Sequence, residues 1–205
     1  MTLEEDRELK EFTRKLGQQV RKTIEQEVLG RFRGEVQVEC FTERQRVNLP
    51  RIMERTKRRI YILTTNLDYT ERFLQKSIRL ALERNKDNSA FKVEILTMDP
   101  EGDVANARAI QLARNVRLYR NELRRSLDNM NDEFGDHPQV EIVTYRTLPT
   151  QMTFIFDDIV VTSVVSLGQQ SREGVHFMLQ NVPEVAETFV THFRALKTLE
   201  MARSY

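Results

Sequence analysis

Two short apolar runs, separated by an amphipathic segment, most constrain how this chain folds. The first is "IYILTTN" at 60–66, and the second is "FKVEILTMDP" at 91–100, which ends in an Asp-Pro pair. Compact runs rich in Ile, Leu and Thr are typical of strands buried on both faces of a sheet. The segment between them, "YTERFLQKSIRLALERN" at 69–85, repeats its apolar residues at helical spacing. Strand, helix and strand in this order predict an α/β fold with parallel strands.

The remaining pattern extends this unit in both directions. Asn48 as a cap, with Pro50 in the first turn, predicts a helix over 48–60. The Arg-rich stretch 103–134 is typical of a helix, or of two helices with an interruption between them. Further strands are expected at 35–41, 139–146, 152–158, 159–166 and 174–180, and a final helix at 184–202. The predicted fold is therefore a mixed, centrally buried β-sheet flanked by helices.

A long amphipathic helix is expected before this domain, over residues 3–29. Its apolar positions recur at spacings of three and four, namely Leu9, Phe12, Leu16, Val20, Ile24 and Val28. Such a stripe packs either on its own domain or against a second copy of the chain. We therefore divide the sequence into residues 1–34, a helix for packing or dimerisation, and residues 35–205, the α/β domain.

Composition excludes several classes of function. With 32 Lys plus Arg against 31 Asp plus Glu, the net charge is +1, which argues against the broad basic field of a nucleic-acid-binding protein. No apolar run reaches the length of about 18 residues that a membrane span requires, and the acidic start is unlike a secretory signal. A lone Cys40 and three isolated histidines give no metal-ligand pattern. We expect a cytoplasmic protein without metal, cofactor or membrane contact.

Polar residues at the ends of the predicted parallel strands are the first candidates for a binding site. In such sheets, ligands usually bind beyond the carboxyl ends of the strands. The candidates there are Asn66, Asp99, Tyr145 and Arg146, together with Arg108 on the following helix. Arg108 is either an anion clamp at a helix start or the partner of Asp99 in a structural ion pair.

The segment "PTQMTFIFDDIVVTS" at 149–163 resembles the catalytic hairpin of the phospholipase D-like superfamily. That family carries His-x-Lys, four residues and Asp, then a strand ending in Gly-Ser and a Glu before a last strand. Here Asp158 stands at the aspartate position, Ser163 near the Gly-Ser, and Glu173 near the glutamate. The resemblance covers residues 35–196 and corresponds to one half of the paired family architecture. It departs from the family pattern at Gln151 and Thr153, which replace the histidine and the lysine.

These replacements bear directly on the chemistry that the resemblance implies. Family members use the histidine as a nucleophile and the lysine to hold phosphate charge. An amide nitrogen is a poor nucleophile with no pKa near neutrality, and a hydroxyl brings no positive charge. The chain is also similar to degenerate superfamily members that serve as sensory or effector domains, often in bacterial regulators. The resemblance thus implies a non-catalytic regulatory module, completed as a homodimer, that binds a small ligand or a protein partner.

Other interpretations of the same residues stay open at this point. Gln151 and Thr153 either hydrogen-bond an uncharged polar ligand or are remnants of a lost site. His176 is the one histidine whose strand position could approach that site. A different hypothesis is a metal-dependent nuclease or phosphodiesterase that uses an acidic set, namely Asp99, Asp158, Glu173 and His176. A third hypothesis is a purely structural assembly module.

Overall fold

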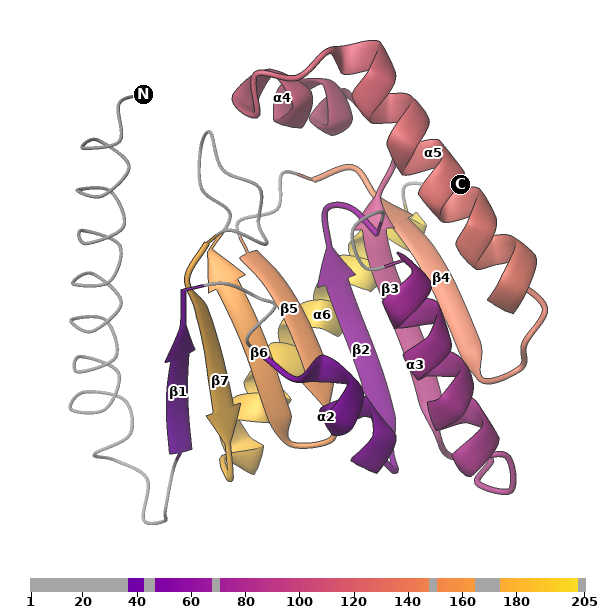
Figure 1. The fold of residues 1–205 in the computed structure, drawn as a ribbon, viewed down its shortest axis with the longest axis vertical. Coiled ribbons are helices and arrows are strands. Elements are labelled where there is room, and N and C mark those ends of the chain that lie inside the picture. The colour runs from indigo at the N-terminus through magenta and orange to yellow at the C-terminus, as the bar shows by residue number, and fades with distance from the viewer. Residues whose placement is uncertain (1–36, 43–46, 68–70, 148–150, 165–173, 203–205) are drawn as a thin grey trace.

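The computed structural model describes residues 37–42, 47–67, 71–147, 151–164 and 174–202 (Figure 1). The N-terminal helix expected over 3–29 lies outside them. The described elements are β1 (Gln37–Phe41), α2 (Leu49–Arg55), β2 (Arg59–Thr64), α3 (Glu71–Arg84), β3 (Lys92–Met98), α4 (Asp103–Gln111), α5 (Val116–Phe134), β4 (Val140–Tyr145), β5 (Gln151–Phe156), β6 (Ile159–Val164), β7 (His176–Gln180) and α6 (Pro183–Ala202). None of the described helices is both long and apolar enough to cross a membrane.

The seven strands that the structure describes form one mixed sheet, in the order β1-β7-β6-β5-β2-β3-β4. The strands β2, β3 and β4 are parallel, while β5, β6, β7 and β1 pair antiparallel along the other half of the sheet. α2 and α3 lie in front of the sheet and α6 behind it (Figure 1). The α/β fold predicted from the sequence is confirmed.

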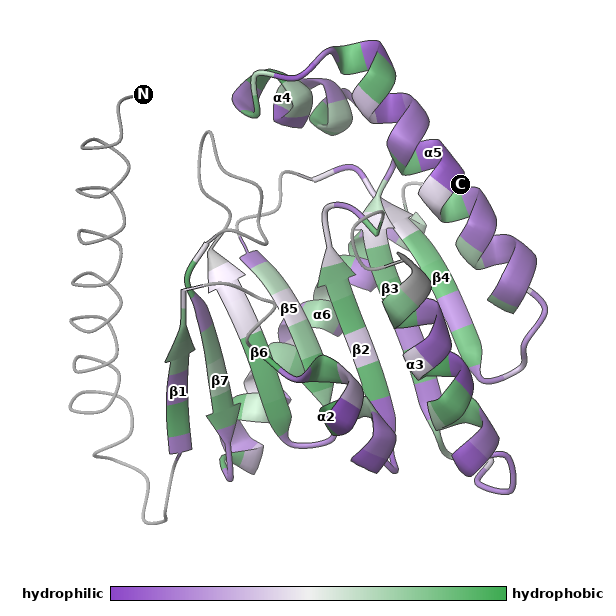
Figure 2. Ribbon diagram, viewed as in Figure 1, coloured by the Kyte–Doolittle hydropathy of each residue, from purple (hydrophilic) through white to green (hydrophobic). Residues whose placement is uncertain are grey.

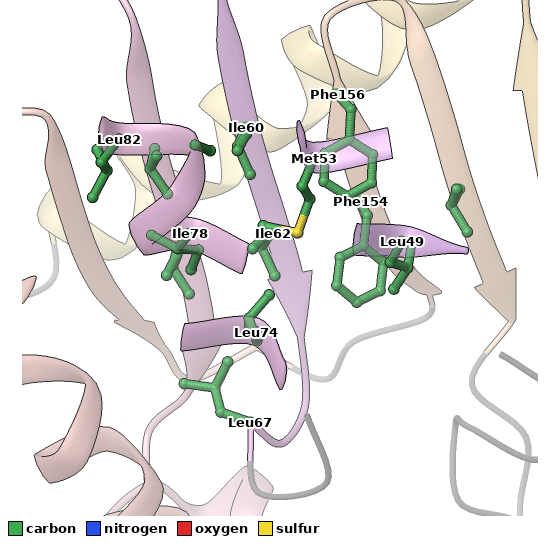
Figure 3. Close-up of a cluster of buried hydrophobic side chains, with 14 of the residues drawn as sticks. Leu49, Met53, Ile60, Ile62, Leu67, Leu74, Ile78, Leu82, Phe154 and Phe156 are labelled. Carbon is green, nitrogen blue, oxygen red and sulfur yellow. The ribbon is translucent and has the colours of Figure 1, made fainter. Parts of the chain in front are cut away.

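Side-chain alternation gives the sheet two apolar faces. On the front face, Ile60, Ile62, Phe154 and Phe156 pack against α2 and α3 (Figure 3). On the back face, the Tyr61 ring stacks on Phe193 of α6, with ring centroids 5.0 Å apart. Figure 2 shows the hydrophobic colour concentrated along the strands, while α5 is mostly hydrophilic.

Two helix boundaries show how local sequence sets the elements. Asn48 accepts a hydrogen bond from the Arg51 amide and caps α2, as the sequence predicted. The helix ends at Arg55 rather than continuing to residue 60, because Thr56 adopts an extended conformation (ψ 134°). The Arg-rich stretch divides into α4 and α5, and Ala113 between them has a left-handed φ of 51°.

Candidate functional site

The carboxyl ends of β2, β3 and β4 lie side by side at one end of the sheet, which we call the strand-end edge. Asn66 follows β2, Asp99 follows β3, and Tyr145 and Arg146 end and follow β4. Four of the predicted site residues therefore lie along one line of adjacent strands. α4 lies beyond this edge in Figure 1, and it carries Arg108, which interacts with Tyr145 at the end of β4.

Asp99 pairs with Arg146 across the strand-end edge. The Arg146 Nε donates to Asp99 Oδ2 at 2.6 Å, and the Glu101 amide donates to Asp99 Oδ1 at 2.8 Å. The hydrogen bond to Asp99 raises the pKa of the Arg146 guanidinium. Gly102 lies close by, because a Cβ there would be 3.4 Å from Arg146 Cγ. This pair links the ends of β3 and β4, and the arginine partner of Asp99 is Arg146 rather than Arg108.

Arg108 is buried beneath α4, with 1% of its surface exposed. Its Nη1 donates to Gln111 Oε1 at 3.1 Å. Burial lowers the pKa of this guanidinium, and the phenols of Tyr119 and Tyr145 act in the opposite direction. Arginine nevertheless stays protonated in proteins. The strand-end edge therefore has a positive charge in its interior, close to two phenols.

The two tyrosines are as buried as the arginine. Tyr145 donates from its hydroxyl to the Thr64 carbonyl at 3.0 Å, so it ties the end of β4 to the end of β2. Burial raises the pKa of Tyr145 well above its ordinary value and that of Tyr119 to about 12. Both phenols are therefore neutral at physiological pH, and each supplies a hydroxyl rather than a charge.

Gln151 and Thr153 occupy the start of β5 on the back face of the sheet, the face that carries Ile155. Gln151 is half-buried and Thr153 is buried. The Thr153 hydroxyl is 3.2 Å from the Thr162 hydroxyl on β6, and Thr162 donates to the Met152 carbonyl at 3.0 Å. The hydroxyl of Thr153 is thus already satisfied by its neighbouring strand.

The front face carries a different polar group at the same level along the strands, next to the start of β5. Met152, Ser163 and His176 are consecutive cross-strand partners on β5, β6 and β7, and all three are buried. The Thr64 hydroxyl on β2, which donates to the Asn66 carbonyl at 3.1 Å, lies 3.8 Å from the Met152 sulfur. The structure therefore separates His176 from Gln151 and Thr153, because the sheet lies between them.

Ser163 is the most unusual member of this front-face group. Its side chain is 1% exposed, and its hydroxyl has no hydrogen-bond partner among the residues that the structure describes. Buried polar groups are nearly always hydrogen-bonded, so each exception requires an explanation such as a bound ligand or water. The sequence analysis placed Ser163 near the family Gly-Ser, but it did not identify this unsatisfied hydroxyl.

Asp157 and Asp158 form the turn between β5 and β6, at the other end of the sheet, where β2 begins. The carboxylate of Asp157 accepts the amides of three consecutive residues, Lys57, Arg58 and Arg59, at 2.8 to 3.1 Å. Asp158 pairs instead with the Arg58 side chain at 2.5 Å. Asp158 is therefore separated from the strand-end edge by the full length of β5, and Asp157 holds the hairpin to the start of β2.

Two further residues complete the comparison with the sequence-predicted site. Glu173 lies outside the described residues. Glu200 on α6, which the sequence analysis missed, is 3% exposed and accepts from the Arg146 amide at 3.1 Å and the Thr147 hydroxyl at 2.9 Å. Nothing in a glutamate near the end of an amphipathic helix indicates this burial.

Of the acidic residues proposed as an alternative metal site, Asp99 and Asp158 are described by the structure and are not brought together. They lie at opposite ends of the sheet. Within the described ranges, no three or more His, Cys, Asp or Glu side chains are grouped so that they could hold a metal ion.

No protein-family model matches this chain, and no curated protein matches it. Solved structures do. Nuc from Salmonella typhimurium, described as a phospholipase D family member, has a TM-score of 0.53 at 17% identity, over 80% of this chain and 95% of Nuc. NucT from Helicobacter pylori has a TM-score of 0.53 at 12% identity, over 80% of this chain and 97% of NucT.

A third similar structure is TrmBL2, described as an archaeal chromatin protein with a novel mode of DNA binding. Its TM-score is 0.52 at 15% identity, and the match covers 94% of this chain. This chain spans 62% of the length of TrmBL2, but nearly all of Nuc and NucT. At these identities the likeness is one of fold.

Proposed function

We propose that this chain, whose fold is phospholipase D-like, is a non-catalytic module that binds a small polar ligand or a protein partner and acts in regulation. The observation that carries this proposal is the spacing of the hairpin. Counted back from Asp158, the histidine and lysine positions of the family are Gln151 and Thr153. Counted back from Asp157, which holds the hairpin, they are Thr150 and Met152. Neither alignment supplies an imidazole or an ammonium group.

The side chains in these positions cannot replace the family chemistry. A threonine hydroxyl without an adjacent base is a weak nucleophile, and an amide is weaker still. A thioether carries no charge that could hold a phosphate. His176 is on the opposite face from Thr153 and is a cross-strand neighbour of Ser163. The arrangement therefore favours binding over phosphoryl transfer.

Two features support a binding role for the end of the sheet at which β2, β3 and β4 finish and β5 starts. Arg108 places a buried positive charge at the strand-end edge, where ligands of α/β sheets usually bind. Ser163 places an unsatisfied hydroxyl on the front face. A ligand that hydrogen-bonds to Ser163 would remove the free-energy cost of that buried hydroxyl.

The catalytic part of the proposal is tested with a phosphodiesterase assay. Purified protein is incubated with bis(p-nitrophenyl) phosphate and with single- and double-stranded DNA, in Mg²⁺, Mn²⁺ or chelator. We expect no turnover. Turnover that disappears in Asp158→Ala or Asp99→Asn, but survives in the exposed-loop control Asp87→Ala, would contradict a non-catalytic role.

The binding part is tested by thermal-shift screening against uncharged and anionic small molecules. A true ligand should raise the melting temperature in proportion to RT ln(1 + [L]/Kd). The same ligand should stabilise the Ser163→Ala or Arg108→Gln variant less than the wild type, depending on which group it contacts. A hit that stabilises both variants as much as the wild type binds elsewhere and would count against this site.

A further inference from the structure

A groove of about 780 Å³ lies at the other end of the molecule, between the last turns of α3 and α5. It borders the amino ends of β3 and β4, so it is far from the strand-end edge; in Figure 1, α3 ends at the lower right and α5 ends above it on the right. Its volume is within the range of about 300–1,000 Å³ that is typical of small-molecule sites. The groove is lined by side chains of α3 and α5 and of the segments that lead into β3 and β4, among them Leu82, Lys86, Lys92, Phe134 and His137.

The walls of this groove are held in place by hydrogen bonds between separate elements. Gln139 at the start of β4 donates from Nε2 to the Asn88 carbonyl at 2.8 Å, which joins the β4 side to the loop after α3. Arg79 of α3 donates from Nε to Glu133 of α5 at 2.9 Å, which joins the two helices. The groove is therefore formed in advance of any ligand, and little conformational free energy is needed to open it.

The floor of the groove is apolar. Leu82 and Phe134 are 5% and 3% exposed and belong to the front-face core. Pro138 adds a further apolar surface at the side of the groove. An aromatic or aliphatic group placed on this floor would bury its own apolar surface together with the small apolar area that Leu82 and Phe134 leave exposed, which favours binding.

The rim of the groove favours negative charge. Glu133 is neutralised by Arg79, which leaves Glu83 as the other carboxylate on the rim, against Lys86 and Lys92. Among the described residues, the exposed ammonium of Lys92 has one hydrogen bond, and it is long, at 3.4 Å to the Pro138 carbonyl. Both lysines can therefore turn toward an anion.

His137 adds a neutral donor to the same rim. Its Nδ1 accepts a hydrogen bond from the Gln139 amide at 3.2 Å. An imidazole nitrogen that accepts has no proton, so the neutral ring carries its proton on Nε2. The Nε2 group can then donate to a ligand.

From these features we propose that the groove binds a small molecule with an aromatic or aliphatic body and one anionic group. The body lies on Leu82 and Phe134, and the anionic group is held by Lys86, Lys92 and His137. A carboxylate, sulfonate or phosphate monoester would meet this requirement. The site is separate from the strand-end edge and from the function proposed for it.

The test uses 8-anilinonaphthalene-1-sulfonate, which combines an aromatic body with a single anionic group. We expect saturable binding by the folded wild-type protein in a fluorescence titration. In Lys86→Glu/Lys92→Glu, affinity should fall by about tenfold, because attraction at two positions becomes repulsion. The matched control is Lys57→Glu/Lys76→Glu, which reverses two exposed lysines outside the groove and should bind as the wild type does.

A second probe separates charge recognition from simple apolar binding. The uncharged analogue N-phenyl-1-naphthylamine should bind more weakly than the sulfonate, and the groove variant should not change its affinity. Circular dichroism melting confirms that each variant is folded. The proposal is overturned if the wild type does not bind the sulfonate, if both double variants bind it equally, or if the neutral analogue binds as tightly.

Discussion

Arg108, Tyr119 and Tyr145 show how one buried charge changes the properties of its neighbours. All three side chains are at most 2% exposed. Burial raises the pKa of each phenol. The Arg108 guanidinium would attract a phenolate, so it partly offsets that rise. Over the physiological pH range, both phenols therefore stay neutral and the arginine stays positively charged.

The pKa of Tyr119 leads to a prediction on alkaline stability. The phenol titrates at about 12 in the folded chain, against 10.0 ordinarily. Between these values the folded state binds more protons than the unfolded state, so stability falls as pH rises. Two pKa units correspond to a loss of about 2 to 3 kcal/mol. Tyr119→Phe should flatten the dependence of the unfolding free energy on pH between 10 and 12, as measured by urea denaturation. An unchanged slope would contradict this origin.

The hydroxyl of Ser163 leads to the prediction that its removal stabilises the protein, whereas most core substitutions destabilise it. Ser163→Ala removes a buried hydroxyl that has no hydrogen-bond partner within the described part of the chain, so it should stabilise the ligand-free protein by about 1 kcal/mol. In a domain of this size, that raises the melting temperature by about 2–4 °C. Thr162→Val is the control, because the Thr162 hydroxyl is satisfied by Met152 and its loss should destabilise. A lower melting temperature in Ser163→Ala would mean that the hydroxyl has a partner in solution.

Among the elements, the β5–β6 hairpin depends on a single carboxylate. Asp157 accepts the amides of three consecutive residues at the start of β2, and its φ of 53° is in the left-handed region. Asp157→Ala should lower the free energy of unfolding by about 2–3 kcal/mol, because it loses these bonds and keeps the strained backbone. Asp157→Asn should cost less, since asparagine tolerates this conformation.

The measurement for this hairpin is urea denaturation at neutral pH. Asp87→Ala, in the exposed turn after α3, is the control and should change stability by less than about 0.5 kcal/mol. Equal effects of the Asp157 and Asp87 substitutions would show that the three amide bonds contribute nothing measurable.

The elements were largely predictable because their signals are local. The Asn48 cap, the apolar runs at 60–66 and 91–100, and the hairpin at 152–164 each contain their own pattern of hydropathy or turn residues. The end of α2 was misplaced, because the competing partner for amides 57–59 is Asp157, about 100 positions away in sequence.

The site was less predictable because it depends on which face each strand side chain occupies. The sequence grouped Gln151, Thr153 and His176, but strand pairing puts a sheet between His176 and the other two. Similarly, Arg146 rather than Arg108 reaches Asp99, since β3 and β4 are adjacent and α4 passes above them. Such relations arise from register and helix placement, which a single sequence does not specify.

At the scale of the whole molecule, the two ends of the sheet have different chemistry. One end has a buried arginine and neutral hydroxyls, and the other has an apolar groove with a cationic rim. We propose that the chain self-associates as a homodimer, since its sequence resembles one half of a paired architecture. Size-exclusion chromatography with light scattering should then give about twice the chain mass of 24.2 kDa. A single-chain mass at all concentrations tested would contradict the dimer.

The position of β1 affects the order in which the molecule can be completed during synthesis. β1 is an outer strand whose partner in the sheet is β7, and Gln180 bonds to Glu39 across 141 positions of sequence. A ribosome therefore releases β1 long before its partner exists, and contacts of such long range form slowly. Until β7 emerges, "QVECF" is an exposed strand available to other nascent chains.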